Sequence, residues 1–265
     1  MQSDRRPSVS VVTAVHAPYV RFLPDVWDSL RAQDLTSWEW LVQLDGPGGG
    51  AVAEALASCG ADRDPRVRAE AHGTAVGPGP TRNIALARAA APLVQNVDAD
   101  DLLEPGALTT LTRALAARPH AGYAVGRARD LLPDGRLRDH PLPLKPGPVP
   151  RGTLPAHWLT APHGYSLPVH PAGILWRRAL LVELGAWTAL HGMEDTGLLM
   201  AAGARATGVL VDANTLRYRK HAAQGSAQPT NFIGAGSQIS LIRQRVAVLS
   251  GLPEWRDPEI SVPVK

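Results

Sequence analysis

The residues best suited to chemistry lie in the segment 93–101, where an apolar run ends in three carboxylates. Side chains alternate along a strand, so Asp98 and Asp100 are expected on one face, about 7 Å apart, with Asp101 beginning a turn. Two carboxylates at the carboxyl end of a strand suit a hard divalent cation, which takes oxygen ligands and often shares them with a substrate phosphate. The alternative is an acidic turn that leads into a helix near Pro105.

Asp45 and Arg82 are candidates for contacts with a nucleotide. Asp45 ends a predicted strand, where it either accepts hydrogen bonds from a base or ribose or forms a plain Asp-Gly turn. Arg82 lies near the start of a predicted helix, whose free N–H groups and dipole favour a phosphate. The alternative for Arg82 is a solvated position on the helix face.

Glu194 and Asp195 form a second reactive pair at the start of a predicted helix. Adjacent helical residues point about 100° apart, so only one of the two is expected to face a ligand. A carboxylate in this position can serve as a general base, or it can simply complement the helix dipole.

Alternating strands and helices position these residues. Strands are predicted at 8–15, 38–44, 66–70, 93–98 and 121–129, and helices at 19–33, 51–58, 81–91 and 105–117. This alternation predicts a parallel sheet covered by helices, with ligands at the carboxyl ends of the strands. Helices at 177–184, 195–202 and about 239–249, and a strand within 206–216, follow.

The segment 141–171 is rich in proline and histidine and has little periodicity, which predicts a lid or an acceptor wall. Five nearby aromatic or imidazole side chains either stack on a sugar or pack in the core: Trp158, His163, Tyr165, His170 and Trp187.

Composition excludes several classes of protein. The 265 residues are 45% hydrophobic and carry a net charge of +3 without a Lys/Arg run, so no nucleic-acid partner is expected. The single cysteine, Cys59, excludes an internal disulfide and a cysteine zinc site. No segment approaches the ~20 apolar residues that span a bilayer, and the first residues lack the apolar stretch of a signal peptide. We therefore expect a cytoplasmic protein without an integral membrane segment.

Four patterns stand in a fixed order along the chain: Asp45-Gly46, the segment 76–83, Asp98-Ala99-Asp100-Asp101, and Gly192-Met193-Glu194-Asp195. With the closing Tyr-Arg-Lys-His segment 218–221, this order resembles the family 2 glycosyltransferases of the GT-A fold, over about residues 8–226. The resemblance implies an α/β fold with a Rossmann-like, mostly parallel sheet flanked by helices and an irregular acceptor-binding half. It implies one domain over 1–265, with a nucleotide-sugar half (8–130), an acceptor and catalytic half (131–226), and a C-terminal helix and tail (227–265).

The resemblance also implies roles for individual residues. Asp98 would hold the ribose, Arg82 would face the nucleotide, and Asp100 would bind a Mn²⁺ or Mg²⁺ ion that bridges the diphosphate. His221 would complete the metal shell. The remaining positions of the expected donor site are Ala14, Asp45 and Ala99.

In this family the base is the aspartate of the Glu-Asp pair, here Asp195, and the sugar is transferred with inversion. A UDP-sugar donor is favoured, although Leu44 stands where many members have an acid before Asp45, and the acceptor is not identified. The alternatives are a nucleotidyltransferase of related fold or a non-catalytic nucleotide-binding module. Residues 13–18 contain neither a glycine-rich loop nor a lysine, which counts against a nucleotidyltransferase.

Overall fold

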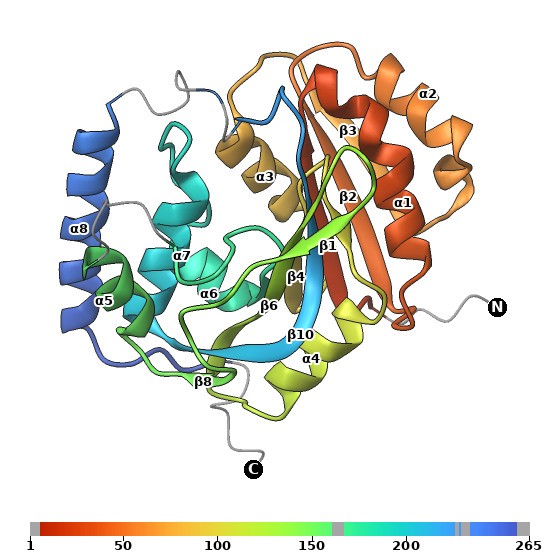
Figure 1. Cartoon of the computed structure of the whole chain (residues 1–265). Helices are drawn as coiled ribbons and strands as arrows, with labels where there is room; N and C mark the ends of the chain where they lie inside the picture. The colour runs from red at the N-terminus through yellow and green to blue at the C-terminus, as the bar shows by residue number, and fades with distance from the viewer. Residues whose placement is uncertain (1–5, 161–166, 226–227, 229–233, 259–265) are drawn as a thin grey trace.

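The computed structural model describes residues 6–160, 167–225, 228 and 234–258. The first part of the chain alternates strands and helices, as the sequence predicts (Figure 1). Its strands are β1 (Val9–Val15), β2 (Trp38–Asp45), β3 (Val67–His72) and β4 (Leu93–Asn96). Its helices are α1 (Leu23–Arg31), α2 (Gly50–Ser58) and α3 (Pro78–Ala87), with two 3-10 turns, η1 (Ala17–Phe22) and η2 (Ala61–Arg63).

These four strands pair in parallel, with β1 between β2 and β4. Four valines of β1 are completely buried, as expected for a β-branched strand covered on both faces: Val9, Val11, Val12 and Val15. The carboxyl ends of the strands therefore meet at one edge of the sheet, where open α/β sheets bind ligands.

The second part of the chain extends the same sheet and adds the remaining helices. Its elements are β5 (Leu102–Leu103), α4 (Ala107–Ala116), β6 (Ala121–Leu131), β7 (Leu137–Asp139), β8 (Gly147–Val149), α5 (Thr153–Thr160), β9 (Leu175–Arg177), α6 (Arg178–Glu183), α7 (Glu194–Arg205), β10 (Thr207–Arg219) and α8 (Ala235–Gly251). Among the described residues the strand order is β3-β2-β1-β4-β9-β6-β10-β5, with β7 beside β6 and β8 beside β10. No helix in these ranges is both long and apolar enough to cross a bilayer.

The sheet is more mixed in direction than the alternation of elements predicts. β9 lies between β4 and β6 and runs antiparallel to both, while β6 and β10 are parallel. Three residues are too few for a periodic pattern to predict a strand such as β9. The short β5 and β8 also pair antiparallel, both with β10.

Two predicted elements differ in their bounds for local reasons. The helix expected at 19–33 is split into η1 and α1, and Pro24 lies in the first turn of α1, where a missing N–H costs nothing. β4 ends at Asn96, so Asp98 and Asp100 are not strand residues, and the alternation argument for them is wrong. They lie in a turn that the hydrogen bond from the Asp101 N–H to the Asp98 carbonyl, 3.1 Å, closes.

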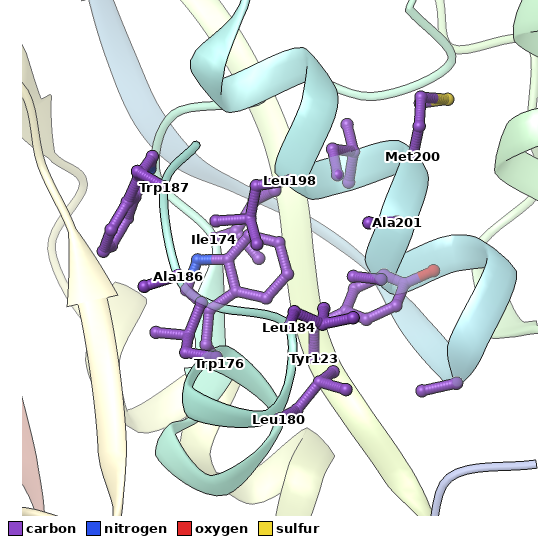
Figure 2. Packing of buried hydrophobic residues seen from close by; sticks show 14 of the residues in the cluster. Tyr123, Ile174, Trp176, Leu180, Leu184, Ala186, Trp187, Leu198, Met200 and Ala201 are labelled. Carbon is purple, nitrogen blue, oxygen red and sulfur yellow. The ribbon is translucent and has the colours of Figure 1, made fainter. Parts of the chain in front are cut away.

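The described part of the segment 141–171 contains two regular elements, β8 and α5, that its composition does not predict. Trp158 of α5 is buried in the same hydrophobic cluster as Leu154. His163 and Tyr165 lie outside the described residues. Figure 2 shows another part of this cluster, where Tyr123, Trp176 and Leu180 pack together beneath α7.

The contact between β6 and β10 depends on a glycine. Gly208 of β10 pairs with Tyr123 of β6, and a methyl group at Gly208 would lie 2.2 Å from the buried Tyr123 ring. We expect Gly208→Ala to lower the free energy of unfolding by about 1–3 kcal/mol, the usual cost of overpacking a core, as measured by urea denaturation.

Gly236→Ala is the matched control, because a methyl group at this position of α8 meets nothing within 4 Å. Alanine favours a helix over glycine by about 1 kcal/mol, so this variant should be neutral or more stable. Equal stabilities of the two variants would contradict the packing argument.

Candidate active site

A cavity of about 850 Å³ opens where β1, β2 and β4 end. Its wall includes seven of the eight residues that the sequence singles out for donor binding, metal binding or catalysis: Ala14, Asp45, Arg82, Asp98, Ala99, Asp100 and Asp195. The eighth, His221, is not part of this wall but contacts Asp100, which is. Residues far apart in the sequence are thus brought to one place.

Arg82 lies at the centre of the acidic group. Its side chain is only 5% exposed, and its Nη2 donates to Asp98 Oδ1 at 2.6 Å. Its Nη1 lies 3.3 Å from Glu194 Oε1 and 3.4 Å from Asp195 Oδ1. Burial alone would lower the pKa of Arg82, but the three carboxylates outweigh burial and raise it. One buried guanidinium therefore forms ion pairs with three carboxylates, one from the turn after β4 and two from the start of α7.

The first turn of α3 explains how Arg82 reaches this position. The helix begins at Pro78, three residues before the sequence prediction, and ends at Ala87. Prolines are tolerated in a first turn because their missing N–H has no partner there. Gly79 allows α3 to approach the chain before α7, since a methyl group at Gly79 would lie 3.1 Å from the Thr188 carbonyl oxygen.

Asp195 has the properties of a base at neutral pH. Burial raises its pKa to about 7, with Arg82 lowering it and the charges of Glu194 and Asp98 raising it. Its side chain keeps 18% of its exposure and lines the cavity. The indole N–H of Trp187 donates to Asp195 Oδ1 at 2.7 Å, which lowers the pKa in part. An aspartate in this state gains a proton just below neutral pH.

Glu194 is directed to Arg82 rather than to solvent at the helix end. Its side chain is 8% exposed and also lines the cavity, so both acids of the pair face the same region. Which of the two acids faces a ligand stays a prediction, although both line the cavity. Its second oxygen, Oε2, is buried without a hydrogen-bond partner among the described residues.

The turn after β4 holds Asp100 against His221. Asp100 Oδ2 lies 2.9 Å from His221 Nε2, and burial, followed by the charge of Asp98, raises the pKa of Asp100. Asp101 is fully buried, and its Oδ1 accepts the N–H of Arg219 at 3.0 Å. Asp101 therefore holds the end of β10 in place through this hydrogen bond, and His221 follows β10 by two residues.

Asp100 and His221 offer one carboxylate and one imidazole, a donor pair that Mn²⁺ accepts more readily than Mg²⁺ does. His221 Nδ1 is buried and has no partner among the residues described. Within the same residues, no cluster of three or more His, Cys, Asp or Glu side chains is arranged to hold a metal ion. A cation here would need its other ligands from a bound diphosphate and water.

Both carboxylate oxygens of Asp45 accept hydrogen bonds from the turn that precedes α3. Oδ1 accepts the N–H of Val76 at 2.7 Å, and Oδ2 accepts the N–H of Gly77 at 3.0 Å. His72 Nε2 lies 3.5 Å from Oδ1. Asp45 lines the cavity, so its contact with a base or ribose stays a prediction, but its observed partners make it a support for the start of α3.

The aromatic candidates separate into two groups. Trp158 is buried in the core and does not line the cavity, whereas His170 does. Burial lowers the pKa of His170 to about 4, and its ring packs on Tyr218 with centroids 4.4 Å apart. No pattern in the sequence predicts the hydrogen bond between Trp187 and Asp195, because the fold brings these residues together from eight positions apart.

The buried cation generates a stability prediction. Arg82→Met would leave three carboxylates without their cation, so we expect the free energy of unfolding at pH 7.5 to fall by about 3–5 kcal/mol. Protonation relieves the repulsion, so the deficit should shrink at pH 5.5. Urea denaturation at both pH values measures the effect.

Arg31→Met is the matched control, because its ion pair with Asp28 is exposed, 62% and 60% for the two side chains. This change should alter stability by no more than about 0.5 kcal/mol at either pH. A similar small change for Arg82→Met would contradict the central role of its charge.

Solved structures with the same architecture include two that were determined with a nucleotide sugar. Staphylococcus aureus TarS 1–349 in complex with UDP-GlcNAc is 20% identical, with a TM-score of 0.69 over 93% of this chain and 68% of that chain. Mannosyltransferase PcManGT from Pyrobaculum calidifontis, in complex with GDP-Man and Mn²⁺, is 16% identical, with a TM-score of 0.58 over 93% and 74%. At these identities the likeness shows the fold, which confirms the expected GT-A type.

Sequence comparison adds a relative and a family. The uncharacterized protein y4gI of Sinorhizobium fredii (strain NBRC 101917 / NGR234) is 33% identical over 118 residues, which are 43% of this chain and only 12% of that protein. The model of glycosyl transferase family 2 matches residues 10–177, more than half of the chain. The protein therefore belongs to glycosyl transferase family 2.

Proposed function

We propose that this protein transfers a sugar from a nucleotide-sugar donor to an acceptor, with inversion, and that Asp195 is the general base. The observation that carries the proposal is the position of Asp195. A carboxylate whose pKa is about 7 lines the same cavity as Asp98, Asp100 and Arg82. A base is most effective when its pKa lies near the working pH.

The donor would lie along the carboxyl ends of β1, β2 and β4. In this proposal Asp98 accepts hydrogen bonds from the ribose, and Ala14, Asp45 and Ala99 line the nucleotide part of the cavity. Arg82 shares its charge among three carboxylates, so its proposed role toward the donor is to hold Asp98 in place through their 2.6 Å hydrogen bond. TarS was solved with UDP-GlcNAc and PcManGT with GDP-Man, so a UDP-sugar is the donor to test first, with a GDP-sugar as the comparison.

The transfer step needs one proton acceptor on the side away from the diphosphate. The acceptor oxygen forms a bond to the anomeric carbon while the bond from that carbon to the diphosphate oxygen breaks. Asp195 takes the proton that the acceptor oxygen loses, and the nucleoside diphosphate leaves as an anion. Asp195 belongs to the 131–226 half, and Asp98 and Asp100 belong to the 8–130 half. This supports the proposal that one half binds the donor and the other half carries the base, within one domain.

We further propose that Asp100 and His221 hold a Mn²⁺ or Mg²⁺ ion. When bound, the cation supplies charge neutralisation for the leaving diphosphate. The proposal is supported by the close Asp100–His221 pair, by the buried free nitrogen of His221 and by the Mn²⁺ in the PcManGT complex.

Replacement of the base should separate chemistry from donor binding. Asp195→Asn keeps the size of the side chain but cannot take a proton, so kcat should fall by about 10²–10⁴-fold. The nucleoside diphosphate should bind with unchanged affinity in titration calorimetry. In the wild type, kcat/KM should fall as the pH drops below about 7, since protonation removes the base. Transfer by Asp195→Asn at the wild-type rate would move the base elsewhere, with Glu194 the first candidate.

Removal of the metal should instead weaken donor binding. Excess chelator should abolish turnover, and Asp100→Asn should lower it by at least about 100-fold, the scale for loss of a major electrostatic stabiliser. Calorimetry with UDP, with and without Mn²⁺, should show that the metal strengthens binding to the wild type but not to Asp100→Asn. Full turnover in excess chelator would contradict the metal proposal, and the assignment of Asp195 as the base would not be affected.

A further inference from the structure

Trp187 makes a polar contact that core packing does not require. Its side chain is 2% exposed and belongs to the hydrophobic cluster beneath α7. Figure 2 shows its ring at the edge of the cluster, apart from the ring of Trp176. From this edge the indole N–H donates to Asp195 Oδ1 at 2.7 Å. A phenylalanine could fill the same apolar space, so the N–H is the feature that needs a reason.

The backbone of Trp187 is held on both sides by one residue of α3. The Trp187 N–H donates to Asn83 Oδ1 at 3.0 Å, and Asn83 Nδ2 donates to the Trp187 carbonyl at 2.8 Å. Asn83 directly follows Arg82, whose guanidinium carbon lies 5.8 Å from the centre of the Trp187 ring. One turn of α3 therefore positions both the cation and the indole that face Asp195.

These contacts fall on one oxygen of the carboxylate. Oδ1 of Asp195 receives the indole N–H and lies 3.4 Å from Arg82 Nη1. Within the described residues, no hydrogen bond is made to Oδ2. A carboxylate held at Oδ1 cannot turn freely, and Asp195 lines the cavity, so Oδ2 is the oxygen left to take a proton.

We propose that Trp187 is a positioning residue for the general base: its indole N–H fixes Oδ1 of Asp195 and thereby aims Oδ2 at the acceptor hydroxyl. The inference rests on the proposed role of Asp195 and adds the residue that orients it. Trp187 touches neither donor nor acceptor in this scheme and acts only through Asp195.

The charges around Asp195 determine what loss of the indole N–H would change. Arg82 faces it from α3, Glu194 from α7 itself and Asp98 from the turn after β4. The indole N–H stabilises the charged form of Asp195 against the two neighbouring acids. Without this bond the pKa of Asp195 should rise, and the enzyme should lose its base at a higher pH.

Trp187→Phe tests the proposal because it keeps a buried ring over Arg82 and removes the N–H. The acid limb of kcat/KM should move up by about one pH unit, the scale of a hydrogen bond to a charged group. At a fixed pH of 7 kcat should fall about tenfold or more, and the KM for a UDP-sugar should stay unchanged. At pH 9 part of the lost kcat should return.

Trp176→Phe is the matched control. Trp176 is buried in the same cluster, and its indole N–H donates at 3.0 Å to Asn96 Oδ1 rather than to a base. This variant loses the same bond type from the same core, so its stability should also fall. Its acid limb should stay at the wild-type pH.

Asn83→Ala is a second test if Trp187→Phe does not fold. It removes the two hydrogen bonds from Asn83 to the Trp187 backbone and keeps the indole. Its acid limb should move in the same direction by a smaller amount. A wild-type profile in a folded Trp187→Phe, or in Asn83→Ala where only that variant folds, would overturn the proposal. Wild-type transfer by Asp195→Asn would instead overturn the base assignment on which the proposal rests.

Discussion

The structure of the site depends on one buried cation that is shared by three carboxylates. Arg82 is in contact with Asp98, Glu194 and Asp195 while its side chain is almost completely buried. A single positive charge cannot compensate three negative charges in a region of low dielectric, so one acid must hold its proton more tightly. Burial raises the pKa of Asp195 to about 7, and the charges of Glu194 and Asp98 add to this effect while Arg82 opposes it. A carboxylate with this pKa exchanges its proton near neutral pH, which is what the proposed general base requires.

Several features of the fold bring Arg82 and the three carboxylates together. Two prolines and Gly79 in the first turn of α3 allow this helix to lie against the start of α7. Asp45 fixes the turn in front of α3 through two backbone N–H groups. The early end of β4 places Asp98 in a turn rather than on a strand, and from there it reaches Arg82.

Local patterns in the sequence predicted most of the elements and the membership of the site. A buried β-branched run predicted β1, and the run that ends in Asp45-Gly46 predicted β2. Acids at strand ends and at a helix start predicted the cavity wall. What the sequence could not predict depends on long-range pairing. β9 is too short for a pattern and gains its strand geometry from β4 and β6 on either side. The contacts of Glu194 with Arg82 and of Trp187 with Asp195 exist only because α3 and α7 meet.

The contacts of the site join the part of the chain that the family model matches to the part that it does not match. The family model ends at residue 177, so it covers Asp45, Arg82, Asp98 and Asp100 but neither Asp195 nor His221. The ion pairs from Arg82 to Glu194 and Asp195 cross this boundary, and so does the bond between Asp100 and His221. Arg82 and Asp100, which lie inside the matched range, thus touch residues outside it that have the complementary chemistry. This complementarity is independent of sequence similarity, because it follows from charge, burial and distance in this chain alone.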